Sequence, residues 1–354
     1  MSKFRDSRFL KLKEYVPGEQ PQDKSYIKLN TNESPYPPSK AVLDILNSEE
    51  ASKLRLYCDP DCNKLRSKLA ELYDVDFENV FVSNGSDEIL NFAFMLYGLE
   101  KGAAFPDITY GFYNVFCKLY GIDYEEIPLC DDFSINPDDY IGNGKFNVIA
   151  NPNAPTGMTM NEEEIEKIIA SNPDNVVVID EAYIDFGGKS CYKLINKYDN
   201  LIVCRTFSKS RSMAGARLGY CFASRELIKD LELIKNSTNP YNVNRLTQAA
   251  GTAALCEDEY YMENCRKIIE TRDYTVKELT ALGFDVLPSL ANFVFAKHTT
   301  IGGEELYLKL KSNGFLVRHF TSARICEFNR ITIGSRAEME SLVNELKSIV
   351  GGTK

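Results

Sequence analysis

Short β-branched runs alternate with longer helical patterns between about residue 78 and residue 235. This alternation is typical of parallel strands joined by crossover helices, and it predicts one large α/β domain over residues 41–240. The strand-like runs are NVFVS (79–83), FNVIA (146–150), NVVVID (175–180), NLIVC (200–204) and RLGYCFA (217–223). Between them, Asn161 and Glu164 have the spacing of a capping box, and residues 224–236 have helical periodicity.

The pattern changes after Asn239 and Pro240. Long helical patterns follow, and then strand-like runs with one helix between them and one after them. The helical patterns lie at 245–255 and 260–282, and the strand-like runs at 292–297, 315–320 and 330–334. This order predicts a smaller α+β domain over residues 241–354. Residues 1–40, rich in Pro, Tyr and Asn, are predicted to form an extended arm.

The composition is that of a globular protein that folds without cross-links. Of the 354 residues, 44% are hydrophobic and 26% are charged, and at about 150 residues per domain this length suits two domains. The 51 acidic residues outnumber the 41 basic ones, and the net charge is -10. Such a chain repels a nucleic-acid backbone on average, so its local basic sites are expected to serve small anions.

Metal binding and membrane insertion are not expected. The ten cysteines are scattered, the nearest pair, Cys58 and Cys62, lacks the spacing of a zinc or thioredoxin-like pair, and the chain has only two histidines. No signal-peptide pattern opens the chain, and no apolar stretch approaches the roughly 20 residues that span a membrane. These features predict a reduced cytoplasmic protein.

Polar residues follow the predicted strands, where open α/β sheets bind their ligands. The segment 84–88 (NGSDE) precedes a helical pattern and suits a phosphate, although an ordinary N-cap has the same appearance. The turn formers NPNAPTG (151–157) follow another strand. Asp180 ends the next one, where a buried carboxylate needs a cationic or protonated partner. For a single Asp, a helix cap or a structural salt bridge is the commoner role.

Lys209 follows a further strand, with Ser208 before it and Arg217 after it. A desolvated lysine among other cations has a lowered pKa and attacks carbonyl carbons to form a Schiff base. Arg217 and the hydroxyls of Thr206 and Ser208 are suited to a phosphate. A lone lysine is more often a solvated surface residue, so the combination carries the argument. Phosphate donors, an amine for an aldehyde and an acid for a ring nitrogen all follow successive strands, and pyridoxal phosphate requires all three.

The chain resembles the fold-type I pyridoxal-phosphate aminotransferases, and most closely the histidinol-phosphate aminotransferases. The motifs that carry the resemblance occur in the family's order along nearly the whole chain: LNTNESPYPPS, RLYCDP, SNGSDE, DITYGFY, NPNAPTG, IDEAYIDF, RTFSKSRSMAGARLGY, ANFVFAK and NRITIGS. The resemblance implies a large domain with a mostly parallel central sheet flanked by helices, plus a smaller α+β C-terminal domain.

The resemblance also implies roles for individual residues. Lys209 would form an aldimine with the cofactor and move the proton between the substrate Cα and the cofactor. Asp180 would pair with the pyridine nitrogen, and Tyr183 would donate to the phenolic oxygen. The remaining cofactor contacts would come from Gly85, Ser86, Asp87, Tyr110, Thr206, Ser208 and Arg217, and from Tyr57 of the neighbouring subunit. The substrate carboxylate or phosphate would be held by Arg330, assisted by Tyr15, Asn32 and Arg318.

Two positions depart from the family's pattern. Ala154 stands where relatives usually have an asparagine that bonds the cofactor's phenolic oxygen, so Asn153 is put forward for that contact, with Tyr183 carrying more of it than usual. Arg211 stands at a position that is commonly apolar or aromatic in relatives. A role in binding a substrate phosphate and a solvent-facing position are the two alternatives, and the second is expected. Two of the assigned residues have ordinary structural alternatives. Tyr110 could be a core or interface tyrosine, and Arg318 could be a surface residue of a strand.

The implied function is transamination by a cytoplasmic homodimer in a ping-pong cycle. Glutamate and 2-oxoglutarate would form one substrate pair, and histidinol phosphate and imidazole-acetol phosphate the other, in histidine biosynthesis. Aromatic amino acid aminotransferases and threonine-phosphate decarboxylase are alternatives, because they share most of the cofactor motifs. A regulatory binding module and a nucleotide-binding oxidoreductase are disfavoured, since the chain lacks a helix-turn-helix pattern in residues 1–40 and the motif GxGxxG after its first strand.

Overall fold

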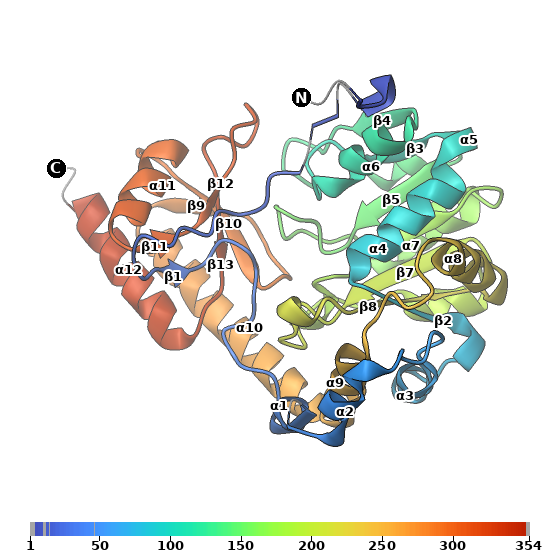
Figure 1. Cartoon of the computed structure of the whole chain (residues 1–354). Helices are drawn as coiled ribbons and strands as arrows, with labels where there is room; N and C mark the ends of the chain where they lie inside the picture. Colours follow the sequence, from blue (N-terminus) through green and yellow to red (C-terminus); the bar gives the residue numbers. More distant parts are fainter. Residues whose placement is uncertain (1–3, 10–11, 14, 46, 352–354) are drawn as a thin grey trace.

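Two sheets organise the chain in this computed structural model, which describes residues 4–9, 12–13, 15–45 and 47–351 (Figure 1). The larger sheet has seven strands in the order β2-β8-β7-β6-β5-β3-β4. Their bounds are β2 (Val80–Ser83), β3 (Ala103–Pro106), β4 (Tyr124–Ile127), β5 (Phe146–Ala150), β6 (Val177–Asp180), β7 (Leu201–Thr206) and β8 (Gly219–Ala223). Only β8 runs against its neighbours; the other pairings are parallel.

Helices cover both faces of this sheet. They are α3 (Asn63–Tyr73), α4 (Ser86–Ala93), α5 (Leu99–Lys101), α6 (Phe112–Tyr120), α7 (Glu162–Ser171) and α8 (Arg225–Thr238), with a π-helical turn, η4 (Phe94–Gly98), after α4. Alternate residues of β6 point to opposite faces of the sheet and so belong to two different cores. Val177 and Ile179 join a core with α3 and α7, whereas Val178 joins a second core with α4, α6 and α8. Strands buried on both faces are typical of parallel sheets, which explains the continuous apolar runs in the sequence.

The strand-like runs and the capping box are confirmed in this half. All five predicted runs form strands, and α7 begins with the reciprocal hydrogen bonds of Asn161 and Glu164. Two strands were not predicted, β3 and β4, because AAFP and YEEI lack a β-branched run. The fold class is confirmed as α/β with a mostly parallel central sheet.

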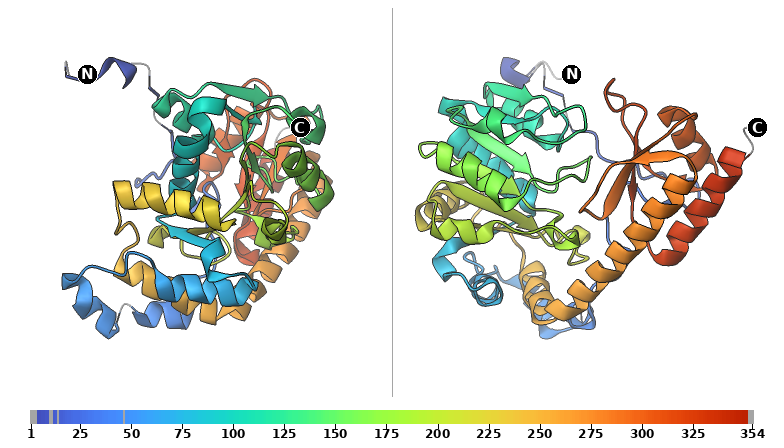
Figure 2. Two further views of the ribbon diagram at one scale, coloured as in Figure 1. Left: turned by 90° about the vertical axis from the view of Figure 1, so that its right-hand side faces the viewer. Right: turned by 180° about the vertical axis from the view of Figure 1, so that it is seen from behind.

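The smaller sheet is antiparallel and has four strands in the order β12-β13-β10-β9. Its strands are β9 (Phe284–Val286), β10 (Phe293–His298), β12 (Arg318–His319) and β13 (Asn329–Thr332). It packs with α10 (Asp258–Ala281), α11 (Gly303–Ser312) and α12 (Arg336–Gly351) around one apolar core. Figure 2 shows α10 running from the base of the molecule into this sheet.

The N-terminal segment crosses to the smaller half, where it takes part in a separate two-stranded sheet, before it returns to the larger half. Its short strand β1 (Ile27–Lys28) pairs in parallel with β11 (Phe315–Leu316). It then leads to α1 (Lys40–Ile45) and α2 (Glu49–Ser52). Helix α9 (Arg245–Cys256) packs with α1 and α3 in the core of the larger half. The predicted domain limits at residues 40 and 240 stay predictions.

Short 3-10 helices complete the described elements: η1 (Ser7–Phe9), η2 (Lys53–Arg55), η3 (Phe77–Asn79), η5 (Pro137–Tyr140), η6 (Ile184–Phe186), η7 (Tyr192–Asn196) and η8 (Ala214–Ala216). Among the residues described, no helix has both the length and the apolar character that crossing a bilayer requires.

The reversed strand β8 brings its N-terminal end to the edge where the parallel strands finish. Gly219, its first residue, pairs with Ser83 at the end of β2. A Cβ atom on Gly219 would lie 2.3 Å from the backbone nitrogen of Ser86 and 2.5 Å from the carbonyl carbon of Gly85. This close approach of two backbones requires glycine. It also fixes the start of α4 beside Arg217, which lies two residues before Gly219.

We expect Gly219→Ala to force β8 and the start of α4 apart and to lower the free energy of unfolding by about 1–3 kcal/mol, the usual range for overpacking. Urea unfolding measures this change. Gly215→Ala is the matched control in the same loop, because a Cβ atom there meets nothing within 4 Å. Equal stability of the two variants would contradict the packing argument.

Candidate active site

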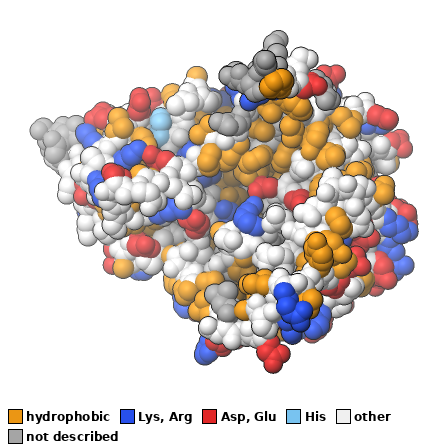
Figure 3. Space-filling model, viewed as in Figure 1, with side chains coloured by type: hydrophobic (Ala, Val, Ile, Leu, Met, Phe, Trp, Pro, Cys, Tyr) orange, Lys and Arg blue, Asp and Glu red, His pale blue; other side chains and the backbone are white. Residues whose placement is uncertain are grey.

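Two connected cavities lie at the carboxyl edge of the seven-stranded sheet. The inner cavity has a volume of about 140 Å³, and the outer one about 570 Å³. Tyr110, Ala154, Tyr183 and Lys209 line both, so they mark the junction. Figure 3 shows this face of the molecule hollowed between the two halves, with charged side chains in the hollow.

One end of the inner cavity has the features of an anion site. Helix α4 begins at Ser86, directly after Gly85, whose φ of +83° is a conformation that favours glycine. A Cβ atom on Gly85 would also lie 2.6 Å from Nη2 of Arg217. Arg217 Nη1 is 3.4 Å from the hydroxyl of Ser208, and Thr206 lines the same cavity. A helix N-terminus, a guanidinium group and hydroxyls therefore converge there.

Asp87 balances the charge of Arg217 at this end. Its Oδ2 atom lies 2.9 Å from Arg217 Nη2, and its Oδ1 atom accepts a hydrogen bond of 2.8 Å from the hydroxyl of Tyr110. Burial, and then the charge of Asp87, raise the pKa of Tyr110 well above its ordinary value. Tyr110 therefore stays a neutral ring over the cavity, with its hydroxyl group fixed.

Asp180 also lines the inner cavity and is only 5% exposed. The hydroxyl of Tyr113 donates to its Oδ2 atom at 3.0 Å, and the backbone N–H of Ala182 donates to Oδ1 at 3.2 Å. Burial raises the pKa of Asp180 from 3.8 to about 6, although the Tyr113 hydrogen bond opposes the rise. This carboxylate is buried with neutral donors only, so a cationic ligand group would be a favourable partner.

Lys209 occupies the junction between the cavities. Its Nζ atom donates to the backbone oxygen of Thr31 at 3.2 Å and lies 5.6 Å from the ring centroid of Tyr183. The hydroxyl of Tyr183 accepts a hydrogen bond of 3.0 Å from Asn32. Asn32 is buried, and its side-chain oxygen accepts from Thr332, which holds the amide in this orientation. The N-terminal segment therefore contributes directly to the site.

Asn153 is not among the residues that the structure brings to either cavity. Its Nδ2 atom donates to Ile108 O at 2.9 Å, and its Oδ1 atom accepts from Thr109 at 2.7 Å. These hydrogen bonds engage the side-chain amide of Asn153 in stabilising the turn. The next residue, Ala154, lines both cavities. The prediction that Asn153 contacts the cofactor therefore has no geometric support, whereas Tyr183 lies where it was expected.

The outer cavity presents cationic and aromatic side chains. Arg330 donates to Asn30 O at 3.0 Å, and its Nε atom is buried with no hydrogen-bond partner in the described structure. Burial lowers its pKa, and no described carboxylate lies within ion-pair distance of it. Arg318 donates to Val16 O and Pro17 O at 3.2 Å each. Tyr15 stacks on Phe112 at 4.4 Å. Arg330 is therefore a cation of this cavity that a ligand anion can pair with.

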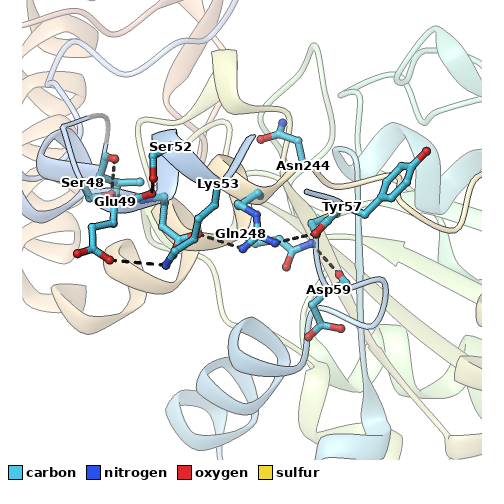
Figure 4. Close-up of polar contacts among 12 residues, drawn as sticks. Ser48, Glu49, Ser52, Lys53, Tyr57, Asp59, Asn244 and Gln248 are labelled. Carbon is cyan, nitrogen blue, oxygen red and sulfur yellow. Dashed lines mark hydrogen bonds and ion pairs between the residues drawn. The ribbon is translucent and has the colours of Figure 1, made fainter. Parts of the chain in front are cut away.

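Tyr57 lies apart from both cavities of its own chain. Its side chain is 79% exposed and stacks on Tyr241 with ring centroids 4.5 Å apart. Figure 4 shows its ring pointing away from the polar contacts that surround Lys53 and Gln248. The backbone of Tyr57 is held by Arg245 at 2.6 Å. The prediction that it serves a neighbouring subunit stays a prediction.

The expectation that Arg211 faces solvent is wrong. The residue is only 2% exposed, and its Nη2 atom lies 2.5 Å from Oδ1 of Asp258, the first residue of α10. Its guanidinium group is 5.5 Å from the ring centroid of Tyr261, one turn further along. The acidic partner comes from a distant part of the chain, which local pattern does not reveal.

Sequence reasoning missed several side chains of this site. Tyr113 holds Asp180, and Lys13, Asn114 and Lys118 line the outer cavity. The signal for Tyr113 was its position in the motif DITYGFY, one helical turn after Tyr110, together with the rule that a buried carboxylate needs donors. No comparable signal marks the two lysines, because lysines on a helix or an arm are usually solvated.

The raised pKa of Asp180 makes the ligand-free protein less stable as the pH rises. The unfolded chain ionises this carboxyl near 3.8, whereas the folded protein keeps the proton until about pH 6. The difference removes about 3 kcal/mol between pH 4 and pH 6. We therefore expect ligand-free Asp180→Asn to be more stable than the parent at pH 8 and to show no gain at pH 4, as measured by urea unfolding.

Asp185→Asn is the matched control for this experiment. Burial alone raises the pKa of Asp185, but Arg205 and Arg211 outweigh that effect and lower it. Its ionised form therefore stabilises the fold above the unfolded pKa, and Asp185→Asn is expected to lose stability at pH 8. Equal responses of the two variants would contradict the assigned pKa directions.

Comparison with known proteins identifies the family. Residues 24–346 match the model for aminotransferase class I and II. A histidinol-phosphate aminotransferase from Brachyspira hyodysenteriae is 48% identical over 99% of this chain and 99% of that protein, and one from Marinomonas sp. is 50% identical over 99% and 100%. A solved histidinol-phosphate aminotransferase from Sinorhizobium meliloti, in complex with pyridoxal-5'-phosphate, has the same fold, with a TM-score of 0.88 at 24% identity over 100% of both chains. The chain therefore belongs to the class I and II aminotransferases and, within them, to the histidinol-phosphate aminotransferase family.

Proposed function

We propose that this protein transfers the amino group of L-histidinol phosphate to 2-oxoglutarate in histidine biosynthesis, with pyridoxal phosphate as cofactor. The observation that carries the proposal is the position of Lys209 at the junction of the two cavities. An anion site and a buried carboxylate lie on its inner side, and a cation without a carboxylate partner among the described residues lies on its outer side. Such a lysine is within reach of both a cofactor and a substrate.

The residues of the inner cavity fit pyridoxal phosphate. When bound, this cofactor supplies an aldehyde that exchanges amino groups and a pyridinium ring that accepts electron density from the substrate. Arg217, Ser208 and the N-terminus of α4 would hold its phosphate, which would compete with Asp87 for Arg217. Asp180, whose carboxylate has only neutral donors, would keep the ring nitrogen protonated, and Tyr113 would keep that carboxylate oriented.

The residues around Lys209 suit proton transfer and substrate orientation. Lys209 Nζ would bond to the aldehyde carbon of the cofactor with loss of water. Once the substrate's amino group has replaced it there, the freed Nζ would carry the proton to and from the substrate Cα. Tyr183, fixed by Asn32, would donate to the phenolic oxygen. Arg330 would pair with the substrate's anionic group, because its part-buried guanidinium group, with a buried Nε that has no described partner, gains from a partner that completes an ion pair. Tyr15 and Arg318 would close the outer cavity around the ligand.

A half-reaction tests the substrate. We expect L-histidinol phosphate, mixed with protein loaded with pyridoxal phosphate, to convert the bound cofactor rapidly to its amine form, followed by absorbance. L-Phenylalanine is the parallel sample for the aromatic aminotransferase alternative, and L-threonine phosphate, followed by release of carbon dioxide, is the one for the decarboxylase alternative. A rapid reaction of either of these with none of L-histidinol phosphate would overturn the named substrate. Lys209→Ala is expected to fold normally and to lose turnover by several orders of magnitude, and normal turnover in that variant would overturn the catalytic assignment.

We also propose that the active protein is a homodimer in which Tyr57 reaches the cofactor phosphate of the partner. Tyr57 is strongly exposed, and it lies with Leu54, Leu56 and Tyr241 among the exposed large hydrophobic side chains. Figure 3 shows a further gathering of hydrophobic side chains on the same half of the molecule, over the region of α6. Large exposed apolar areas of this kind mark interaction surfaces. A cytoplasmic location and the absence of a nucleic-acid partner stay predictions from composition.

Subunit mixing tests the shared site. Tyr57→Ala is expected to weaken cofactor binding, and Lys209→Ala to abolish turnover. A mixed dimer of the two variants has one site with both residues intact. At limiting pyridoxal phosphate, the mixture is therefore expected to exceed the activity of either parent. A monomer by light scattering, or a mixture no more active than its components, would contradict the proposal.

A further inference from the structure

Four consecutive side chains around Lys209 contact four different partners. Lys209 donates to Thr31 O, and Ser212 donates to the hydroxyl of Ser34 at 2.9 Å. Between them, Ser210 donates to Asp185 Oδ2 at 2.5 Å, and Arg211 pairs with Asp258. The segment that carries the reactive lysine is therefore held by three separate parts of the chain: the N-terminal segment, the turn after Tyr183 and the first turn of α10.

Asp185 links this segment to the neighbouring strand end. Asp185 lies in η6, two residues after Tyr183. Its carboxylate accepts hydrogen bonds from Arg205 of β7 and from Ser210. Arg205 packs against Tyr73 and Tyr220 at 5.1 and 5.9 Å from their ring centroids. The lowered pKa of Asp185, despite its burial, arises from Arg205 and Arg211. The two loops that carry Tyr183 and Lys209 are therefore joined by buried, charged hydrogen bonds.

Arg211 extends the same connection to α10. Its side chain is 3% exposed, whereas that of Asp258 is 35% exposed, so the pair closes the buried cluster toward solvent. Tyr261, under the guanidinium group, is fully buried and accepts a hydrogen bond of 3.0 Å from the backbone of Ser39. Further along α10, Arg272 donates to Phe186 O at 2.8 Å. Helix α10 therefore contacts both active-site loops, at two places along its length.

We propose that Arg211 is a positioning residue, which fixes the backbone of Ser208 and Lys209 through its ion pair with Asp258. The inference rests on the proposed function, because Ser208 and Lys209 are the cofactor-binding residues that the pair would hold. A loop that is ordered before the ligand arrives loses less conformational entropy on binding. The effect is largest for a ligand that forms no covalent bond with Lys209, since only non-covalent contacts then retain it.

Pyridoxamine phosphate is such a ligand, and its affinity for the ligand-free protein is the readout. We expect Arg211→Met, which keeps much of the side-chain volume but removes the charge, to raise the Kd for pyridoxamine phosphate about tenfold. Asp258→Asn is expected to raise the Kd in the same direction by a smaller factor, because Asp258 is partly exposed. The double variant is expected to match Arg211→Met, since both changes remove one interaction. Calorimetry measures Kd well below the unfolding temperature of each variant.

Arg225→Met is the matched control. Arg225 also pairs with an aspartate, Asp76, at 2.8 Å, but both side chains are exposed and lie outside the active site. Its Kd is expected to equal that of the parent. If Arg211→Met fails to fold, Asp258→Asn carries the test alone. A lowered unfolding temperature with an unchanged Kd would assign Arg211 to packing only and overturn the inference. If the parent itself does not bind pyridoxamine phosphate, the proposed function fails instead.

Discussion

Burial of charge at the carboxyl edge of the central sheet is the constraint on which this site depends. Six parallel strands and one reversed strand bring polar side chains to one edge, where water no longer screens them. Each buried charge then needs a partner, or its pKa moves toward the neutral form. Asp180 and Asp185 show both outcomes. Asp180 has only neutral donors and a raised pKa, whereas Asp185 has Arg205 and Ser210 and a lowered one.

The presence or absence of a carboxylate partner likewise separates cations that stabilise the fold from cations that can bind a ligand. Arg205 and Arg211 are paired with buried or half-buried carboxylates and therefore hold loops together. Arg330 has backbone and aromatic contacts but no carboxylate partner in the described part of the chain. Arg217 is intermediate, because its partner Asp87 lies on the wall of the cavity itself. Charges that the fold leaves unpaired, or pairs only at the cavity wall, point to where ligands bind.

Sequence pattern predicted the framework of this fold and most of the cavity. The apolar runs that became β2, β5, β6, β7 and β8 were long enough to recognise. Residues that follow β2, β5, β6 and β7, together with Arg217 before β8, line the inner cavity. Strands β3 and β4 were missed, because pairing with neighbours rather than composition makes them strands. The hydrogen bonds of Asn153 could not be predicted, because its amide bonds to Ile108 and Thr109, which are far away in sequence.

The sequence by itself determined which chemical groups stand at the strand ends, because local periodicity and turn formers mark those positions. It thereby marked Lys209, Asp180 and Arg217 as candidates for the reactive lysine, the acid for a ring nitrogen and a phosphate donor. Only the tertiary structure decided which charges are paired. Arg211 meets Asp258, and Tyr113 meets Asp180, across long stretches of chain. Pairing depends on which elements pack together, and that packing minimises buried, unpartnered charge over the whole molecule, which no local pattern records.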